Sequence, residues 1–376
     1  MMSRPLPLMP FIGATVLLAV LAGCATSEKP KPKPLEPLTS QIAGRQVWTQ
    51  RVDASALPST VAVNAGVFTV AGGDGAVVAL QADNGRELWR SSAAGKLSAG
   101  VGSDGKVAAL VTRDGKLVAV EGGRTLWQKP LATRVATAPL VAGERVFVLG
   151  TDRSVQAFDA QSGQRLWGIQ RPNDPLTLAQ AGVIAAFKDT LLVGQGARLV
   201  GLEPRDGSVK FDVAVASPRG TNEVERLADL VAPASRVGDI VCARSFQAAV
   251  GCVDAQLGTL KWTRAGGGTD GVAADEQTVF GADASDRITA WKASTGEVLW
   301  TSDKLMHRGL SAPLIVGKAV VFGDAEGMLH FMSRDKGDAV LRLPTDGSAI
   351  LGAPVISGMT MLVVTKAGGV FAFRPE

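Results

Sequence analysis

The chain has 376 residues, with 39 lysines and arginines against 35 aspartates and glutamates, so its net charge is only +4. This small charge excludes the strongly basic surface typical of nucleic-acid-binding proteins. Hydrophobic residues make up 46% of the chain, which is enough to bury a core in one large domain or two ordinary ones.

The first 23 residues have the pattern of a lipoprotein signal peptide. Arg4 precedes an apolar stretch from Leu6 to Leu21, which is short for a membrane span and typical of a signal sequence. The tetrapeptide ending at Cys24 reads Leu-Ala-Gly-Cys, the pattern of a bacterial lipobox. We therefore expect residues 1–23 to be removed and Cys24 to carry lipid. An ordinary cleavage site that happens to contain a cysteine is the alternative.

Residues 24–40 are rich in lysine and proline and are expected to form an extended, lipidated tether. Ala25 follows the cysteine, where an aspartate would favour retention at the inner membrane. The sequence therefore predicts a protein anchored in the outer membrane and facing the periplasm.

Residues 41–376 repeat one motif, a glycine followed four residues later by a large apolar residue. NGRELW, from Gly85 to Trp89, is a clear copy. Successive copies are separated by 38 to 51 residues, a period typical of repeat proteins. The motif ends at Trp48, Trp89, Trp127, Trp167, Phe211, Trp262, Trp300 and Leu341.

Each period contains four short apolar segments separated by turn residues. In the third period they are Ala138–Val141, Arg145–Gly150, Ser154–Phe158 and Gln164–Trp167. Four short strands in about 40 residues are typical of one propeller blade. The motif glycine suits a hairpin position with positive φ, and we expect the motif aromatics to pack between neighbouring blades.

The ends of the repeat region predict how the ring closes. The last period supplies three strands and stops at Glu376, whereas a lone fourth strand, Gln46–Gln50, stands at the beginning. We expect this N-terminal strand to complete the C-terminal blade, because closure removes exposed sheet edges. The fold class is therefore all-β, an eight-bladed β-propeller of four-stranded antiparallel blades. A seven-bladed ring, with the copy at Phe211 or Leu341 accidental, is the alternative.

Two consecutive intervals are longer than the others, and both gain residues just after the fourth strand. The extra segments lie at 168–182 and 213–237. Connections from equivalent strands of adjacent blades leave the same face, so these loops should lie side by side and form a functional surface. Tolerated insertions are the alternative. Residues 222–230 of the second loop have a helical pattern.

Cys242 and Cys252 lie ten residues apart on two neighbouring strands. They are a candidate disulfide, since the periplasm is oxidising and the two residues could face each other across a hairpin. Two buried free thiols are the alternative. The role of such a disulfide would be structural.

The lipobox, the tether, the repeats and the loop RGTNEVERLADL at residues 219–230 together resemble the BamB family, a lipoprotein subunit of the outer-membrane β-barrel assembly machine. The stretches 305–313 and 323–330 also look like this family. The resemblance covers essentially the whole chain after Cys24. It implies a scaffold without catalysis or cofactor, which docks on the periplasmic POTRA domains of the barrel subunit BamA. Such a scaffold assists the folding and insertion of outer-membrane proteins, which are possible direct clients.

The resemblance also implies the residues of the docking face. Leu176 and Leu178 match a Leu-x-Leu-Arg motif, although Ala179 replaces its arginine. Arg226 and Asp229 match a second, acidic motif, in which Val231 stands where another acid is common. The contact is therefore expected to depend mainly on the leucines.

Two other classes of protein share features with this chain. Quinone-dependent alcohol dehydrogenases also form eight-bladed rings, but they carry adjacent cysteines and calcium ligands that have no counterpart here. No metal site is expected, and His307 is assigned a structural role. A general peptide-binding or polysaccharide-binding lipoprotein stays open, because fold does not determine function.

Overall fold

The computed structural model describes residues 30–55, 61–93, 95–171, 176–217 and 221–376. Every regular element in these residues is a β-strand. In this part of the chain, no helix has the length and hydropathy needed to cross a bilayer. The predicted signal peptide and Cys24 lie outside the described residues. Residues Pro32–Glu376 form one compact unit.

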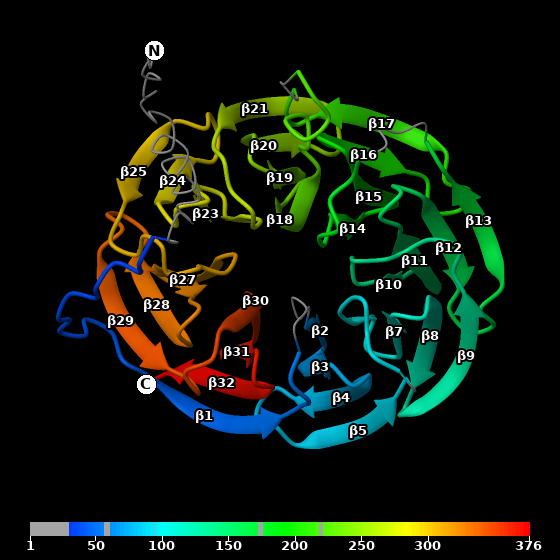
Figure 1. Cartoon of the computed structure of the whole chain (residues 1–376), viewed down its shortest axis with the longest axis horizontal. Helices are drawn as coiled ribbons and strands as arrows, with labels where there is room; N and C mark the ends of the chain where they lie inside the picture. Colours follow the sequence, from blue (N-terminus) through cyan, green and yellow to red (C-terminus); the bar gives the residue numbers. More distant parts are fainter. Residues whose placement is uncertain (1–29, 56–60, 94, 172–175, 218–220) are drawn as a thin grey trace, which may run out of the picture. The chain divides into compact units, whose positions relative to one another are not determined.

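This unit is a ring of eight four-stranded antiparallel sheets, as predicted (Figure 1). The seven-bladed alternative is wrong. In each blade the first strand lies nearest the centre of the ring and the last strand lies at its rim (Figure 1). We number the blades in chain order and call these the inner and outer strands.

The first four blades follow one another without interruption. Blade 1 contains β2 (Ala62–Asn64), β3 (Val67–Ala71), β4 (Ala76–Gln81) and β5 (Glu87–Ser92). Blade 2 contains β6 (Gly102–Ser103), β7 (Val107–Val111), β8 (Lys116–Glu121) and β9 (Arg124–Pro130). Blade 3 contains β10 (Leu140–Ala142), β11 (Arg145–Leu149), β12 (Val155–Asp159) and β13 (Arg165–Ile169). Blade 4 contains β14 (Ile184–Phe187), β15 (Thr190–Gln195), β16 (Arg198–Leu202) and β17 (Val209–Ala214).

The remaining blades complete the ring. Blade 5 contains β18 (Leu230–Val237), β19 (Ile240–Ser245), β20 (Ala249–Asp254) and β21 (Thr259–Ala265). Blade 6 contains β22 (Ala273–Ala274), β23 (Thr278–Ala282), β24 (Ile288–Lys292) and β25 (Val298–Ser302). Blade 7 contains β26 (Leu314–Val316), β27 (Ala319–Gly323), β28 (Met328–Ser333) and β29 (Ala339–Pro344). Blade 8 contains β30 (Ile350–Ser357), β31 (Thr360–Thr365), β32 (Gly369–Pro375) and β1 (Gly44–Arg51).

Blade 8 closes the ring with strands from both ends of the chain. β1 pairs antiparallel with β32 from Gly44 opposite Pro375 to Arg51 opposite Gly369, with Trp48 opposite Ala372. A bulge interrupts the register between Gln46 and Trp48. The predicted closure by the N-terminal strand is therefore confirmed.

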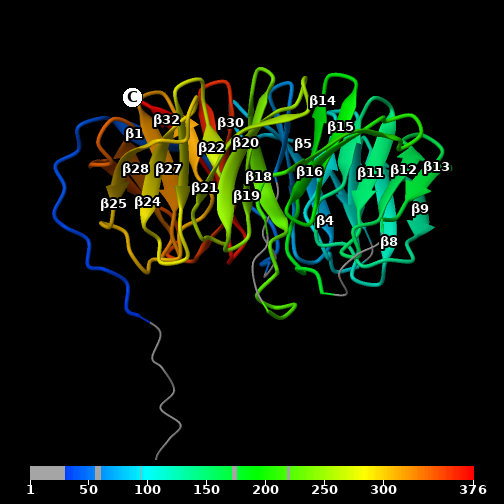
Figure 2. The same ribbon diagram turned by 90° about the horizontal axis from the view of Figure 1, so that it is seen from above.

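The antiparallel order of the strands gives the ring two different faces (Figure 2). The turns that join the first strand to the second, and the third to the fourth, lie on one face, which we call the hairpin face. The connections between blades leave the other face, together with the turns between second and third strands. We call this second face the loop face.

The repeated motif packs each blade on the next. A Cβ added at Gly163, whose φ is +67°, would lie 2.5 Å from the ring of Trp127 of the preceding blade. Glycine is thus required both for the turn and for the room that the indole occupies. The Trp127 Nε1 also donates a hydrogen bond to the Ala160 carbonyl at 2.9 Å.

The same contact recurs around the ring, with Leu341 against Gly44 at the closing blade. Trp127 and Trp262 are buried, and the other motif aromatics are half-buried at the rim. The motif residues pack on the glycines as follows: Trp48 on Gly85, Trp89 on Gly123, Trp127 on Gly163, Trp167 on Gly207, Phe211 on Gly258, Trp262 on Gly296 and Trp300 on Gly337.

Candidate functional site: the two-loop surface

Two long connections, 170–183 and 215–229, leave the loop face from adjacent blades. They join blade 3 to blade 4 and blade 4 to blade 5, and each is longer than any other connection between blades. Residues 172–175 and 218–220, which belong to these loops, lie outside the described residues. From the described residues of the two loops, we call residues 176–180 and 221–229 the two-loop surface.

The helix expected at residues 222–230 is not present, and this prediction was wrong. The Asn222 Oδ1 accepts the Glu225 amide at 2.9 Å, and the Glu225 carboxylate accepts the Thr221 amide at 2.7 Å. These are the hydrogen bonds of a helix start, but only a single turn follows. Leu230 already begins β18, the inner strand of blade 5. The segment before it is therefore too short for a second helical turn.

Asp229 joins the second loop to the first loop and to blade 3. Its Oδ1 accepts the Arg153 Nε at 3.0 Å and lies 2.8 Å from the Arg153 Nη2. Its Oδ2 accepts the Leu178 amide at 3.3 Å. Both charged side chains are mostly buried, with 17% of Arg153 and 15% of Asp229 exposed. We call this ion pair the loop clamp. Together with the hydrogen bond to the Leu178 amide, it brings the two loops into contact, as the sequence predicted.

The other three residues assigned to docking lie around this clamp. Leu176 is 36% exposed and Arg226 is also exposed. Leu178 is half-buried and lines a small cavity with Leu149 and Leu230. The structure therefore brings Leu178 and Asp229 into contact and leaves Leu176 and Arg226 available at the surface.

Arg153 was missed by the sequence analysis. It lies in the turn of blade 3 between β11 and β12, 76 residues before Asp229. Its φ of +61° is unusual for a residue other than glycine. Nothing in the spacing of the motif could have identified this partner, since the contact forms only when blades 3 and 5 are placed in the ring.

Two grooves flank the two-loop surface. One, of about 710 Å³, is lined by Val224, Leu227 and Phe246, and we call it the apolar groove. The other, of about 620 Å³, is lined by Thr177 and Ala179 of the first loop, by Arg113 of blade 2 and by Arg134 of the connection between blades 2 and 3. We call it the arginine groove. Both arginines are exposed.

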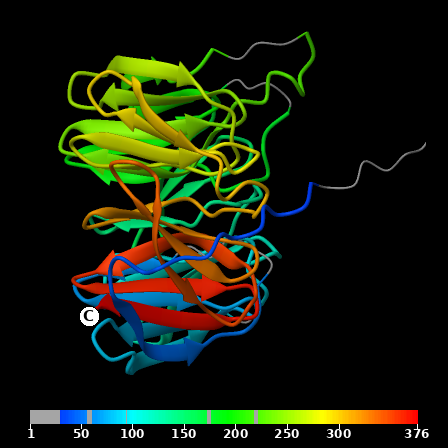
Figure 3. The same cartoon turned by 90° about the vertical axis from the view of Figure 1, so that its left-hand side faces the viewer.

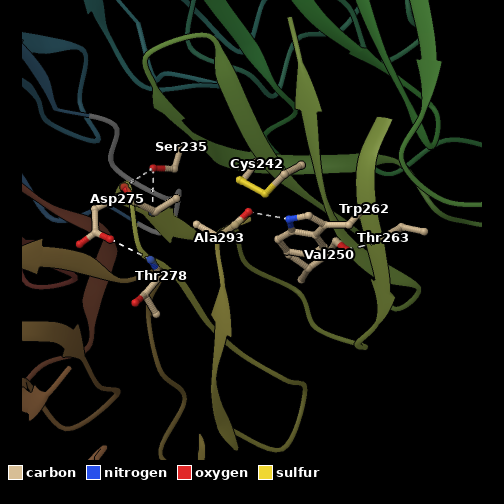
Figure 4. Close-up of a disulfide and its surroundings, with 10 residues drawn as sticks. Ser235, Cys242, Val250, Trp262, Thr263, Asp275, Thr278 and Ala293 are labelled. Atoms are coloured by element: carbon tan, nitrogen blue, oxygen red, sulfur yellow. Dashed lines mark hydrogen bonds between the residues drawn. A yellow bond between two sulfur atoms is a disulfide. The ribbon is translucent and has the colours of Figure 1, made fainter. Parts of the chain in front are cut away.

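Blade 5, which follows the longer loop, contains a disulfide between Cys242 and Cys252 (Figure 4). The two residues lie directly opposite each other on β19 and β20, with Cα atoms 4.0 Å apart. Both are buried beside Trp262, whose Nε1 donates to the Ala293 carbonyl of blade 6 at 2.7 Å. The disulfide thus joins the two central strands of blade 5, and Asp229 directly precedes the first strand of this blade.

The described residues contain no group of three or more histidines, cysteines, aspartates or glutamates placed to hold a metal ion. His307, which was assigned a structural role, donates its amide to the Ser285 carbonyl of blade 6 at 3.1 Å. The second histidine, His330, is fully buried in blade 7 against Asp324. Neither histidine lies in the two-loop surface.

Comparison with known proteins places this ring in a family. The family model described as outer membrane protein assembly factor BamB matches residues 39–96 and 73–302. The outer membrane protein assembly factor BamB of Burkholderia pseudomallei is 37% identical over 372 residues, which cover 97% of both chains.

Solved structures give the same fold. The crystal structure of BamB from Moraxella catarrhalis superposes with a TM-score of 0.80 at 23% identity, covering 88% of this chain and 99% of that one. The quinohemoprotein alcohol dehydrogenase of Comamonas testosteroni superposes with a TM-score of 0.66 at 15% identity, covering 89% of this chain and 78% of that one. At these identities the likeness concerns the fold alone.

Proposed function

Since the chain belongs to the BamB family of outer membrane protein assembly factors, we propose that it is a non-catalytic scaffold of the outer-membrane assembly complex. In this proposal Cys24 carries the lipid anchor, and the protein faces the periplasm from the outer membrane. The two-loop surface docks on the POTRA domains of a BamA-type barrel subunit. The scaffold then assists the folding and insertion of β-barrel outer-membrane proteins.

The loop clamp is the observation that supports this docking surface best. Arg153 and Asp229 are mostly buried within the protein, so their charges are used to fix the two loops on the ring. A surface held in one conformation before binding loses less conformational entropy when it binds. We therefore assign Asp229 a positioning role and assign direct contact to Leu176 and Arg226.

The arginine groove supplies positive charge beside Ala179. In the family motif this position carries an arginine, whereas here Arg113 and Arg134 line the same groove as Ala179. Charges at the edge of an interface mainly accelerate association and guide orientation. We propose that these two arginines meet acidic groups of the partner in place of the missing side chain.

Capture of the barrel subunit by the detergent-solubilised lipoprotein tests this proposal. The wild type is expected to bring down a large outer-membrane barrel with periplasmic repeats. Leu176→Asp should lower capture at least tenfold, because a charge replaces an apolar anchor. Leu178→Asp should do the same, and Arg226→Glu should weaken capture in a salt-dependent way.

Leu257→Asp is the matched control. Leu257 is 71% exposed in the hairpin between β20 and β21 of blade 5, on the opposite face of the ring. The same substitution there should leave capture unchanged. Equal capture by wild type, Leu176→Asp and Leu178→Asp would move the docking surface elsewhere, and capture of peptides or polysaccharide without any barrel would favour a general binding lipoprotein.

The non-catalytic part of the proposal is tested by dye reduction. Quinone-dependent dehydrogenases of this fold carry adjacent cysteines over the quinone, whereas Cys242 and Cys252 are joined across two strands inside a blade. We expect no alcohol-dependent dye reduction by the purified protein supplied with quinone and calcium. Sustained dye reduction would instead show that the protein is a quinone-dependent dehydrogenase.

A further inference from the structure

We infer that residues 33–41 form a strap docked across the outer edge of blade 7, so that the tether leaves the ring at one fixed point on the loop face. The end of the segment expected to be a tether is therefore part of the folded ring. The consequence for membrane orientation rests on the proposed lipidation of Cys24, whereas the docking of the strap does not.

The first end of the strap is held by its main chain. The Lys33 amide donates to the Met306 carbonyl at 2.9 Å, and the Lys33 carbonyl accepts the Arg308 Nη1 at 3.2 Å. The Lys33 Nζ also lies 3.3 Å from the Asp303 carboxylate. All three partners belong to the connection between blades 6 and 7.

Arg308 is itself fixed by a buried ion cluster, which we call the strap clamp. The Asp324 Oδ2 accepts the Arg308 Nε at 2.8 Å and lies 2.8 Å from the Nε2 of His330. Only 4% of the Arg308 side chain and none of Asp324 is exposed. Arg308 also pairs with Glu326 at the surface. This arrangement aims one guanidinium nitrogen at the strap, and a charged donor gives a strong bond to a carbonyl.

The rest of the strap follows the outer strand of blade 7. Leu35 packs against the apolar cluster that contains Leu305. The Glu36 carbonyl accepts the Arg342 Nη1 at 2.6 Å, and the Gln41 amide donates to the Val340 carbonyl at 2.8 Å. Glu36 and Gln41 thus use one side-chain donor and one main-chain acceptor of the outer strand.

A comparison between blades shows that the strap covers this edge. Val340 directly precedes the closing residue of its motif and is only 8% exposed. At the same position in other blades, Leu88 is 42% exposed and Leu299 is 51% exposed. The outer edge of blade 7 is therefore buried where the equivalent edges of blades 1 and 6 are open.

The strap crosses the full height of the ring (Figure 3). Its residue 41 lies close to Gly44 on the hairpin face, where β1 starts beside the end of β32, and its first residue, Lys33, lies on the loop face. Lys33 is nine residues from Cys24, a distance of at most about 30 Å for an extended chain. If the strap were released, the free chain would extend from Gly44 on the hairpin face to Cys24, twenty residues earlier. Fully extended, this segment would span about 70 Å.

The two-loop surface projects from the same face on which Lys33 lies. Blade 7 lies across the ring from blade 3 (Figure 1), so the lipid and the docking loops are attached at opposite sides of the loop face. The loop face is thus held near the bilayer, and the hairpin face is turned toward the periplasm. A partner that approaches along the membrane meets the docking loops first.

Amide hydrogen exchange on the full lipidated chain in detergent tests the docking of the strap. We expect protected amides at residues 33 and 41 in the wild type and at least tenfold faster exchange in Arg342→Ala. Arg90→Ala is the matched control, because Arg90 follows Trp89 in blade 1 as Arg342 follows Leu341 in blade 7, and it forms an ion pair with the neighbouring Glu87. Strap amides that exchange like an unfolded peptide in the wild type would overturn the inference. So would protection that survives both Arg342→Ala and Arg308→Ala.

The orientation has a separate measurement. A fluorophore on Lys336→Cys reports on the hairpin face, since Lys336 is an exposed residue in the turn between β28 and β29. Energy transfer to acceptors in a vesicle of neutral phospholipid should rise when Arg342→Ala releases the strap. Unchanged transfer would overturn the fixed exit point. Absence of lipid on Cys24 by mass spectrometry would contradict the proposed anchoring and leave the exchange result standing.

Discussion

Two parts of the ring are each held by an ion pair between an arginine and an aspartate, and the two pairs differ in burial. The loop clamp, Arg153 with Asp229, fixes two long connections between blades 3 and 5. The strap clamp, Arg308 with Asp324, fixes residues 33–41 on blade 7. The first pair is partly open to water, whereas the second is almost completely buried and includes His330.

This difference in burial assigns the two sides different roles. A buried ion pair is weakly screened, and removing one partner leaves an uncompensated charge in the interior. The strap clamp therefore keeps Arg308 in the position from which it binds the Lys33 carbonyl. The loop clamp lies between two grooves and fixes the two loops before a partner binds. In the roles that we propose, one side of the loop face holds the protein to its anchor and the other presents a surface for recognition.

The largest effect is expected in the strap clamp. Asp324→Ala should lower the free energy of unfolding by ~3–5 kcal/mol, because Arg308 and His330 lose their shared carboxylate in the interior. Urea titration of the purified chain measures this loss. Asp229→Ala is the natural control, with a smaller loss expected. Equal losses for the two variants would show that burial does not distinguish the clamps.

The disulfide of blade 5 should give the next largest effect. Cys242 and Cys252 close a loop of ten residues, and reduction should lower the free energy of unfolding by ~2–3 kcal/mol through the larger entropy of the unfolded chain. Calorimetry with and without a reductant measures the difference. The double alanine variant should not respond to the reductant, and a response in that variant would mean that the reductant acts elsewhere.

The loop clamp should show a coupled effect on stability and capture. Asp229→Ala and Arg153→Ala are each expected to lower the free energy of unfolding by ~1–2 kcal/mol. The double variant should lose little more than either single one, since both remove one contact. Capture of the barrel subunit should fall to the same extent in all three. If Arg153→Ala leaves capture intact while Asp229→Ala abolishes it, Asp229 contacts the partner directly.

The smallest effect concerns pH. Burial lowers the pKa of His330, although its hydrogen bond to Asp324 opposes this shift. Between this lowered pKa and 6.5, the unfolded chain takes up a proton that the folded chain does not. The contribution of His330 to the free energy of unfolding therefore falls as pH decreases through this window, by at most ~1.4 kcal/mol per pH unit. His330→Gln should lose this dependence in melting experiments between pH 7 and pH 5. An unchanged dependence would assign it to other groups.

Asp324 extends the same trend to more acidic solutions. Burial alone would raise the pKa of Asp324, but hydrogen bonds from His330, the Met328 amide and Arg308 outweigh burial and lower it. The stability that its charge provides is present above pH 3.8 and is lost as pH falls through the lowered pKa. Asp324→Asn should therefore flatten the acid limb of the stability curve.

The family, the eight blades and the closing strand could all be predicted from the sequence. The motif that ends at residues such as Trp89 and Trp262 recurs with the period of a blade, and each copy is a local pattern of glycine, strand and turn. The lone strand before residue 51 and the three strands after residue 350 could satisfy each other only by pairing. Cys242 and Cys252 could be placed opposite each other because a hairpin relates them.

The contacts that distinguish one side of the ring from the other could not be predicted in this way. Arg153 and Asp229 are 76 residues apart, and the helical pattern after Asn222 gave no sign that Asp229 would be drawn into the ring. The strap joins residue 33 to residue 308, and its sequence is that of a free tether. Local patterns determined the blades because each blade repeats the same short-range packing, whereas only the closed ring decided which distant charges meet.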